Sequence, residues 1–177
     1  MRALHLFGSI VLVAALALSA NAQCSANGSP ASCGQAGSVS MTAGRVVRLQ
    51  MSAGSTSLTA PTTSDFDAGF NSTTGPTLTV SANAAWTLHI RAASALWTAT
   101  NTATGVAARV DKPAADLKWS TSSGGAFTAL TNSDASLVSG SATASDATTL
   151  YFQTLYGWSV DTPGNYSLSI VLTLTSP

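Results

Sequence analysis

Apolar and polar residues alternate along much of this chain, with the two-residue period of half-buried β-strands. The alternation is clearest over residues 47–51 and 86–92, where every second side chain is apolar. Other stretches with strand character lie at 55–61, 77–82, 96–100, 117–120, 127–130, 137–138 and 149–158. Together with the final stretch 166–176, the pattern predicts about eight or nine short antiparallel strands, as in a β-sandwich or barrel.

Turn-forming residues between these strands predict how the strands connect. Asn83 is the turn residue of a predicted β-hairpin over residues 77–90, and the glycine pair at 124–125 is expected to close a second hairpin. Residues 62–76 are punctuated by Gly, Asn and Pro and are expected to form a loop. The Ser-, Thr- and Ala-rich stretch 135–149 is expected to be mainly a flexible connection.

The segment Asp161-Thr162-Pro163-Gly164 predicts the turn before the last strand. Pro163 presets φ at the first central position and Gly164 supplies a positive φ at the second, which is the composition of a type II turn. Asp161 is expected to organise this turn through hydrogen bonds to the backbone. The strand that follows places five apolar residues on one face: Tyr166, Leu168, Ile170, Leu172 and Leu174. A face this apolar must be covered, by the chain itself or by a neighbour.

The first 22 residues predict a cleaved secretory signal peptide. A positive start is followed by an unbroken apolar run and by an A-x-A site that ends at Ala22. The apolar run is too short to span a bilayer comfortably, so no membrane span is expected in the mature chain. We therefore expect the protein to be secreted, periplasmic or displayed at the cell surface.

Residues 23–44 are predicted to form a disulfide loop and an N-terminal extension, and residues 45–177 a single β-sandwich domain. Cys24 and Cys33 are the two cysteines of the chain. An oxidising compartment makes a disulfide between them the expected state. The residues between them include Asn-Gly and Ser-Pro pairs, which are typical of a turn.

The low content of charged residues limits the kinds of partner that the protein is expected to bind. Only 8% of the residues are charged, and all seven acidic residues are aspartate. Ser and Thr take the place of Glu and Lys on the wet faces, which favours strands over helices. The net charge is zero and no basic patch is present, so nucleic acid is not an expected partner. Low charge also weakens repulsion between copies and permits self-association.

No catalytic centre or metal site is predicted, and we expect a protein that is not an enzyme and needs no cofactor. His89 is the only histidine beyond the signal peptide, and it lies on the expected wet face of a strand. We therefore favour a solvated surface histidine over a general base. A secreted hydrolase that uses His89 is kept as a third hypothesis, after the two given at the end of this subsection. Asp65 and Asp67 flank Phe66 in the predicted loop and could bind calcium together with backbone oxygens, but they lack the spacing of a calcium loop, so a solvated loop is favoured.

Three aromatic residues are candidates for a ligand-binding platform. Trp119, Tyr156 and Trp158 carry flat apolar rings that a carbohydrate could stack against. The favoured alternative is that these rings are buried in the core or cover the edge of the sandwich, as aromatic residues of β-rich domains mostly do.

The last twenty residues, WSVDTPGNYSLSIVLTLTSP, resemble the ending of fimbrial subunits of the spore coat protein U type. Those small secreted bacterial proteins end in a comparable PG-x-Y turn and an alternating apolar strand. The resemblance implies an immunoglobulin-like sandwich on the cell surface, with subunits that assemble by β-strand addition. Residues 35–52 are then the candidate donated strand.

The leading hypothesis is therefore an exported structural β-sandwich protein, a fimbrial or surface-assembly subunit whose partners are copies of itself or other surface subunits. The alternative is a carbohydrate- or host-surface-binding adhesin module, with a glycan as ligand and the three aromatic residues at its site.

Overall fold

The computed structural model describes residues 25–34, 37–101 and 106–177. The chain divides into two units, Met1–Thr42 and Ala43–Pro177. The predicted signal peptide and Cys24 lie outside the described residues. In the described part of the first unit, the side chains are exposed and the backbone forms no helix or strand. All of the elements below belong to the second unit.

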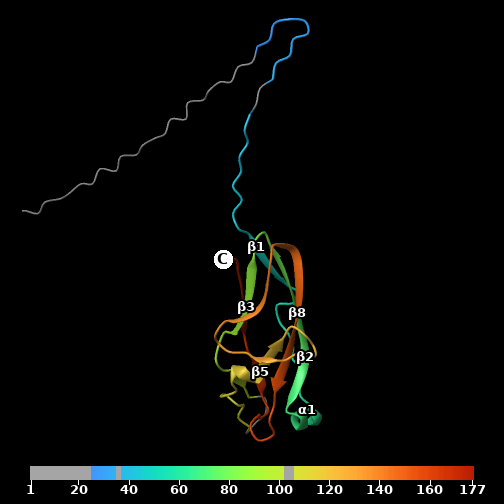
Figure 1. Cartoon of the computed structure of the whole chain (residues 1–177). Coiled ribbons are helices and arrows are strands. Elements are labelled where there is room, and N and C mark those ends of the chain that lie inside the picture. Colours follow the sequence, from blue (N-terminus) through green and yellow to red (C-terminus); the bar gives the residue numbers. More distant parts are fainter. Residues whose placement is uncertain (1–24, 35–36, 102–105) are drawn as a thin grey trace, which may run out of the picture. The chain divides into compact units, whose positions relative to one another are not determined.

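The described residues of the second unit form three antiparallel sheets (Figure 1). The largest has five strands, in the order β1 (Val47–Met51), β2 (Phe70–Ala82), β8 (Thr143–Leu155), β5 (Leu117–Ser120) and β6 (Thr128–Ala129). The second has three strands, in the order β10 (Ile170–Thr175), β3 (Trp86–Ala92) and β7 (Ala135–Gly140). The third pairs β4 (Thr98–Thr100) with β9 (Asn165–Ser167). The prediction of a mostly β protein with antiparallel strands is confirmed.

Alternate residues of the two larger sheets meet in one hydrophobic core. The buried side chains that β2, β3, β5 and β8 contribute are Leu78, Val80, Ala82, Trp86, Leu88, Ile90, Ala92, Leu117, Trp119, Leu150 and Phe152. The strand β3 follows its predicted alternation at every position, with buried residues separated by half-buried ones. Because removing apolar surface from water is the main favourable term in folding, this shared core holds the two sheets together.

The predicted hairpin over residues 77–90 is wrong. β2 pairs with β1 and β8, whereas β3 pairs with β10 and β7, so the chain crosses between sheets after Ala82. The side chain of Asn83 accepts from the backbone of Val46 and donates to that of Gly44, each at 2.8 Å. Alternation identified the core-facing residues correctly, but it carries no information about which strand is the neighbour.

The predicted loop over residues 62–76 contains a helix and part of a strand. The short helix α1 (Thr63–Ala68) begins at a capping box, in which the Asp65 carboxylate accepts from the backbone N–H of Thr62 at 2.7 Å. The helix ends at Gly69, which has the positive φ of 80° that glycine adopts readily. β2 then continues through Gly75 and Pro76 at a register shift. Among the described residues, no helix is long and apolar enough to cross a membrane.

Two further connections differ from their predictions. Residues 135–149 are not a flexible connection, since they form β7 and the first half of β8, whereas 55–61 form no strand. The many Ser and Thr residues of 135–149 lie mostly on β7 and β8. The hairpin around the glycine pair 124–125 is confirmed, because β5 pairs with β6. A short 3-10 turn, η1 (Ala114–Asp116), precedes β5.

The final strand is divided in two, contrary to its prediction. β9 pairs with β4 and β10 pairs with β3, with Leu168 and Ser169 between them. The predicted apolar face is nevertheless retained, because its members all pack against the core while remaining partly exposed: Tyr166, Leu168, Ile170, Leu172 and Leu174. A side-chain pattern can therefore continue across a change of partner strand.

The predicted type II turn is also wrong, because Gly164 has no positive φ. Glycine is needed there for a different reason. A Cβ atom on Gly164 would lie 2.7 Å from Cβ of Ala108 and 3.2 Å from the carbonyl oxygen of Thr100. The missing side chain therefore lets two distant segments of the chain approach each other.

We expect Gly140→Ala to destabilise the fold by about 1–3 kcal/mol through overpacking. A Cβ at this position would lie 2.8 Å from Cζ2 of Trp86, a ring fixed in the core. Urea unfolding followed by tryptophan fluorescence measures the effect. Gly124→Ala is the matched control and should be close to neutral, since nothing lies within 4 Å of its added Cβ. Equal stability of the two variants would contradict the packing described for Trp86.

Candidate functional site

A groove lies between the segment that follows β1 and the last two strands. Its volume is about 640 Å³. Met51 and residues 53–58 line one part of it, and residues 166–170 with Leu172 line another. Core residues from β5 and β8 also reach the groove, among them Leu150 and Phe152. The groove is therefore a gap in the covering of the hydrophobic core.

The strand β10 borders this groove and has an unpaired edge. β3 pairs with one side of β10, from Ile170↔Ala92 to Thr175↔Thr87. No strand in the described part of the chain pairs with the other side. An edge of this kind presents unpaired backbone N–H and C=O groups and is a template for a further strand.

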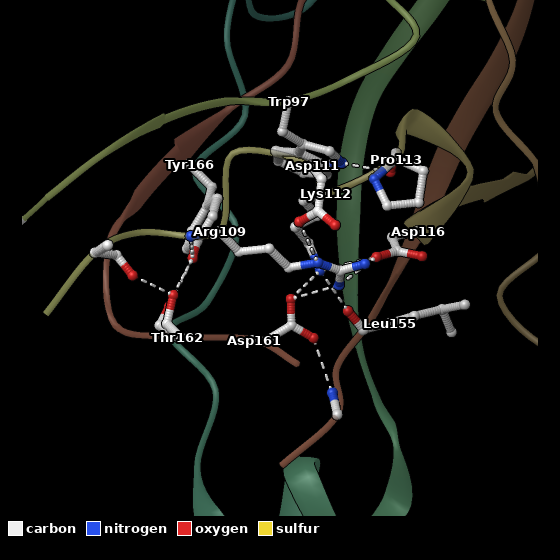
Figure 2. A network of polar contacts seen from close by, with 12 residues as sticks. Trp97, Arg109, Asp111, Lys112, Pro113, Asp116, Leu155, Asp161, Thr162 and Tyr166 are labelled. Carbon is white, nitrogen blue, oxygen red and sulfur yellow. Dashed lines mark hydrogen bonds and ion pairs between the residues drawn. The ribbon is translucent and has the colours of Figure 1, made fainter. Parts of the chain in front are cut away.

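A cluster of charged side chains lies beside the turn that leads into β9 (Figure 2). Nζ of Lys112 is 2.8 Å from Oδ1 of Asp161 and 3.2 Å from Oδ2 of Asp116. Nη1 of Arg109 is 3.1 Å and 3.2 Å from the same two oxygens. The side chains of Lys112 and Asp161 are only 3% and 7% exposed. Two cations and two carboxylates thus share one largely buried site, and Nε of Arg109 also pairs with the exposed carboxylate of Asp111 at 3.3 Å.

Backbone groups complete the hydrogen bonding of this cluster. Lys112 donates to the carbonyl oxygen of Leu155 at 2.9 Å, and Oδ2 of Asp161 accepts from the N–H of Gly157 at 2.8 Å. Burial by itself raises the pKa of Asp161. The hydrogen bond and charge of Lys112, with Gly157 and Arg109, outweigh it and hold the pKa of Asp161 below its ordinary value. The buried charges are therefore paired, which is the condition for their stability.

Tyr166 fixes the turn on its other side. Its hydroxyl group donates to the carbonyl oxygen of Thr162 at 2.6 Å and accepts from the N–H of Arg109 at 3.0 Å. Its ring packs against the core. Pro163 lies exposed in the same turn, between the Asp161 and Tyr166 anchors. Two sets of contacts, which share Arg109, therefore hold the chain where it enters the last strands.

A second feature is an aromatic shelf, formed by Phe66, Tyr156 and Trp158. The ring centroid of Phe66 is 4.7 Å from that of Trp158 and 5.5 Å from that of Tyr156. Trp158 is 61% exposed, and its Nε1 donates to Oδ1 of Asp67 at 3.0 Å. Burial raises the pKa of the Tyr156 hydroxyl. A cavity of about 420 Å³ adjoins the shelf and is lined by Phe66 and Tyr156.

The other predicted site residues lie elsewhere. Trp119 is buried in the core, where its Nε1 has no hydrogen-bond partner, so it does not join Tyr156 and Trp158 on the shelf. His89 is half-buried on β3, opposite Thr173 and Ser136. Cys33 is exposed, and its disulfide with Cys24 stays a prediction because Cys24 is outside the described residues.

The described residues hold no cluster of three His, Cys, Asp or Glu side chains that could bind a metal ion. Asp65 is instead engaged in the cap of α1, where hydrogen bonds from Thr62 lower its pKa. Asp67 holds Trp158. The two acidic residues around Phe66 therefore have local structural partners.

Sequence reasoning missed the partners of Asp161. Arg109, Lys112 and Asp116 lie within one short stretch, 109–116, in which four of eight residues are charged, against 8% for the whole chain. That local concentration was the available signal. The partner Asp161 lies 49 residues beyond Lys112, a separation at which periodicity carries no information.

We expect Tyr166→Phe to reduce the free energy of unfolding by about 1–3 kcal/mol, because it leaves the N–H of Arg109 and the carbonyl of Thr162 without their partner. Urea unfolding measures the loss. Tyr151→Phe, which removes the hydroxyl of another half-buried tyrosine on β8, serves as the control and should cost less. If the two variants are equally stable, the hydroxyl of Tyr166 does not anchor the turn.

No protein-family model matches this chain, and no curated protein sequence matches it either. The proposed function therefore rests on the geometry of three features: the groove, the charged cluster and the aromatic shelf.

Proposed function

We propose that this protein is an exported structural subunit of the cell surface, which joins copies of itself or other surface subunits by β-strand addition. The observation that carries the proposal is the apolar groove beside the unpaired edge of β10. A strand added to that edge would satisfy its backbone groups and place every second side chain in the groove.

We infer an immunoglobulin-like sandwich from the order of the strands. In such a domain, strands A, B, E and D form one sheet, and strands C and F lie side by side in the other. The strands β1-β2-β8-β5 of the first sheet and β3-β10 of the second correspond to A-B-E-D and C-F, with β6 and β7 as additional edge strands. The buried Trp86 on β3 matches the tryptophan of strand C, and the hydrogen bond from Tyr166 to Thr162 matches the tyrosine corner near the start of strand F.

The proposed acceptor site is the position of the next strand in this arrangement. In an immunoglobulin-like domain, strand G pairs with the outer edge of strand F. The corresponding edge of β10 is unpaired within the part of the chain that the structure describes. The apolar side chains that a strand G would cover include Ile170 and Leu172, which are only partly buried and line the groove.

The favoured donor is the segment 37–43 of a second copy. Val39 and Met41 alternate with serines there, and both are almost fully exposed, at 101% and 89%. The predicted donor 35–52 is too long, because β1 is already paired with β2 from Val47 to Met51. Seven extended residues span roughly 23 Å, which is the length of an ordinary strand.

Deleting residues 23–43 is expected to abolish assembly. Light scattering coupled to size exclusion, over a range of protein concentrations, measures this. The wild-type mass should rise with concentration, because strands pair between copies, while the deletion variant should remain a monomer. A wild-type protein that is monomeric at every concentration would overturn the proposal.

A matched pair of variants separates strand addition from a general effect of the extension. Val39→Asp with Met41→Asp places charges on the face that would enter the groove and should also prevent assembly. Ser38→Asp with Ser40→Asp adds the same charge to the opposite face and should leave assembly largely intact. Equal loss in both pairs would contradict an alternating strand in the groove.

The aromatic shelf supports a second candidate function, a carbohydrate- or host-surface-binding module. Trp158 is exposed, yet its orientation is fixed by stacking on Phe66 and by the hydrogen bond to Asp67. A ring held in this way offers a flat apolar face at little cost in side-chain entropy. The platform differs from the predicted one, since Phe66 takes the place of Trp119.

If the shelf binds a glycan, Trp158→Ala should weaken binding at least tenfold (about 1.4 kcal/mol). A glycan array identifies the ligand, and titration calorimetry gives its affinity for each variant. Val160→Ala, a neighbouring exposed position, is the control and should bind like the wild type. Absence of any bound glycan, with unshifted emission from the wild type, would remove this candidate.

A further inference from the structure

Lys112 and Asp161 hold an amine and a carboxyl group in contact inside the second unit. Nζ of Lys112 is 2.8 Å from Oδ1 of Asp161, and the two side chains are 3% and 7% exposed. Both residues line the cavity of about 420 Å³ beside the aromatic shelf, but little of either side chain is in contact with bulk water. The ion pair keeps Nζ beside the carboxyl group of Asp161, and such proximity favours reaction between two groups over the same groups free in solution.

We propose that Lys112 and Asp161 condense after folding into an intramolecular amide, an isopeptide bond between two side chains. The bond that forms joins Nζ of Lys112 to Cγ of Asp161, and the bond that breaks joins Cγ to Oδ1. One ammonium and one carboxylate become one neutral amide and one water molecule. Atoms and charge balance without an oxidant, a cofactor or a second substrate.

Asp116 is placed to carry the protons. Its Oδ2 is 3.2 Å from Nζ of Lys112 and takes a proton from the ammonium, which frees the lone pair for attack. Nη1 of Arg109 contacts both Oδ2 of Asp116 and Oδ1 of Asp161, and so brings these oxygens together. Asp116 passes the proton to Oδ1. A second proton follows the same route from the nitrogen as Cγ–Oδ1 breaks, and Oδ1 leaves as water.

The oxygen that stays on Asp161 also has a suitable partner. Oδ2 accepts from the backbone N–H of Gly157 at 2.8 Å. When the amine attacks, negative charge develops on the oxygens of Cγ, and a fixed N–H donor stabilises that charge. After the reaction, Oδ2 is the amide carbonyl oxygen and keeps this hydrogen bond.

The amide product keeps the two backbone hydrogen bonds of this site and leaves fewer buried charges than the ion pair does. The amide nitrogen keeps one hydrogen, and the carbonyl oxygen of Leu155, 2.9 Å from Nζ, accepts it. Arg109 and Asp116 remain as one ion pair. Four charged groups in a largely buried site become two, which lowers the desolvation penalty that buried charges carry.

The bond would act as a covalent tie within the domain. It joins the segment before η1 to the turn that leads into β9 and β10. The inference does not depend on the proposed function, since it rests on the charged cluster alone.

The mass of the denatured, reduced protein tests this proposal directly. Wild-type protein should be lighter than its sequence mass by one water, and peptide sequencing should find a fragment in which residues 112 and 161 are joined. Lys112→Gln should show its full sequence mass. Lys118→Gln alters the other lysine of the chain, which lies outside the cluster, and should still lose the water.

Asp116→Asn separates chemistry from simple proximity. It leaves Lys112 and Asp161 in place but removes the proton carrier, so the variant should fold and keep its full mass. Wild-type protein at its full sequence mass would overturn the proposal, and this result does not depend on whether any variant folds. Loss of water without a joined fragment would also overturn it, since aspartate can lose water by cyclising on its own backbone.

Discussion

The apolar face of β10 must be removed from water, although this strand lies at the edge of its sheet. β3 pairs with one side of it, and the core that both larger sheets share covers part of its face. The remainder borders the groove, where residues such as Ile170 and Leu172 stay partly exposed. The same physical requirement that builds the core therefore leaves one position that a further strand would complete.

The contacts around the turn at 161–166 make that position well defined. The buried carboxylate of Asp161 is held by Lys112, Arg109 and the backbone of Gly157, and Tyr166 ties the turn to the segment before η1. The chain is thus fixed just before it enters the last two strands. A preformed edge would lose little conformational entropy if a strand bound to it, which favours the proposed strand addition.

Much of the fold was predictable from local pattern, and the failures have physical causes. The faces of β3 and of the last strands were identified correctly, because inside and outside positions alternate along a strand. The neighbours of β2 and β3 were not, since both strands send their apolar residues into one core whichever sheet they join. Gly75 and Pro76 suggested a loop, but they lie in β2 at a register shift.

The candidate site was less predictable, because it depends on contacts between distant residues. The sequence predicted that Asp161 organises its turn. Its cationic partners, Arg109 and Lys112, lie about fifty residues earlier, and the only sign of them in the sequence was a local concentration of charged residues. Trp119 and Trp158 are equally apolar in sequence, but one is buried in the core and the other is exposed on the shelf. Burial of a single aromatic ring depends on tertiary packing, which the sequence pattern does not specify.

Amide hydrogen exchange of β10, compared between dilute and concentrated protein, tests the central claim most directly. The account predicts that amides of residues 170–175 and 37–43 gain protection together as the concentration rises, while those of β3 do not change. Protection of β10 that is the same at every concentration would contradict an acceptor edge completed by another copy.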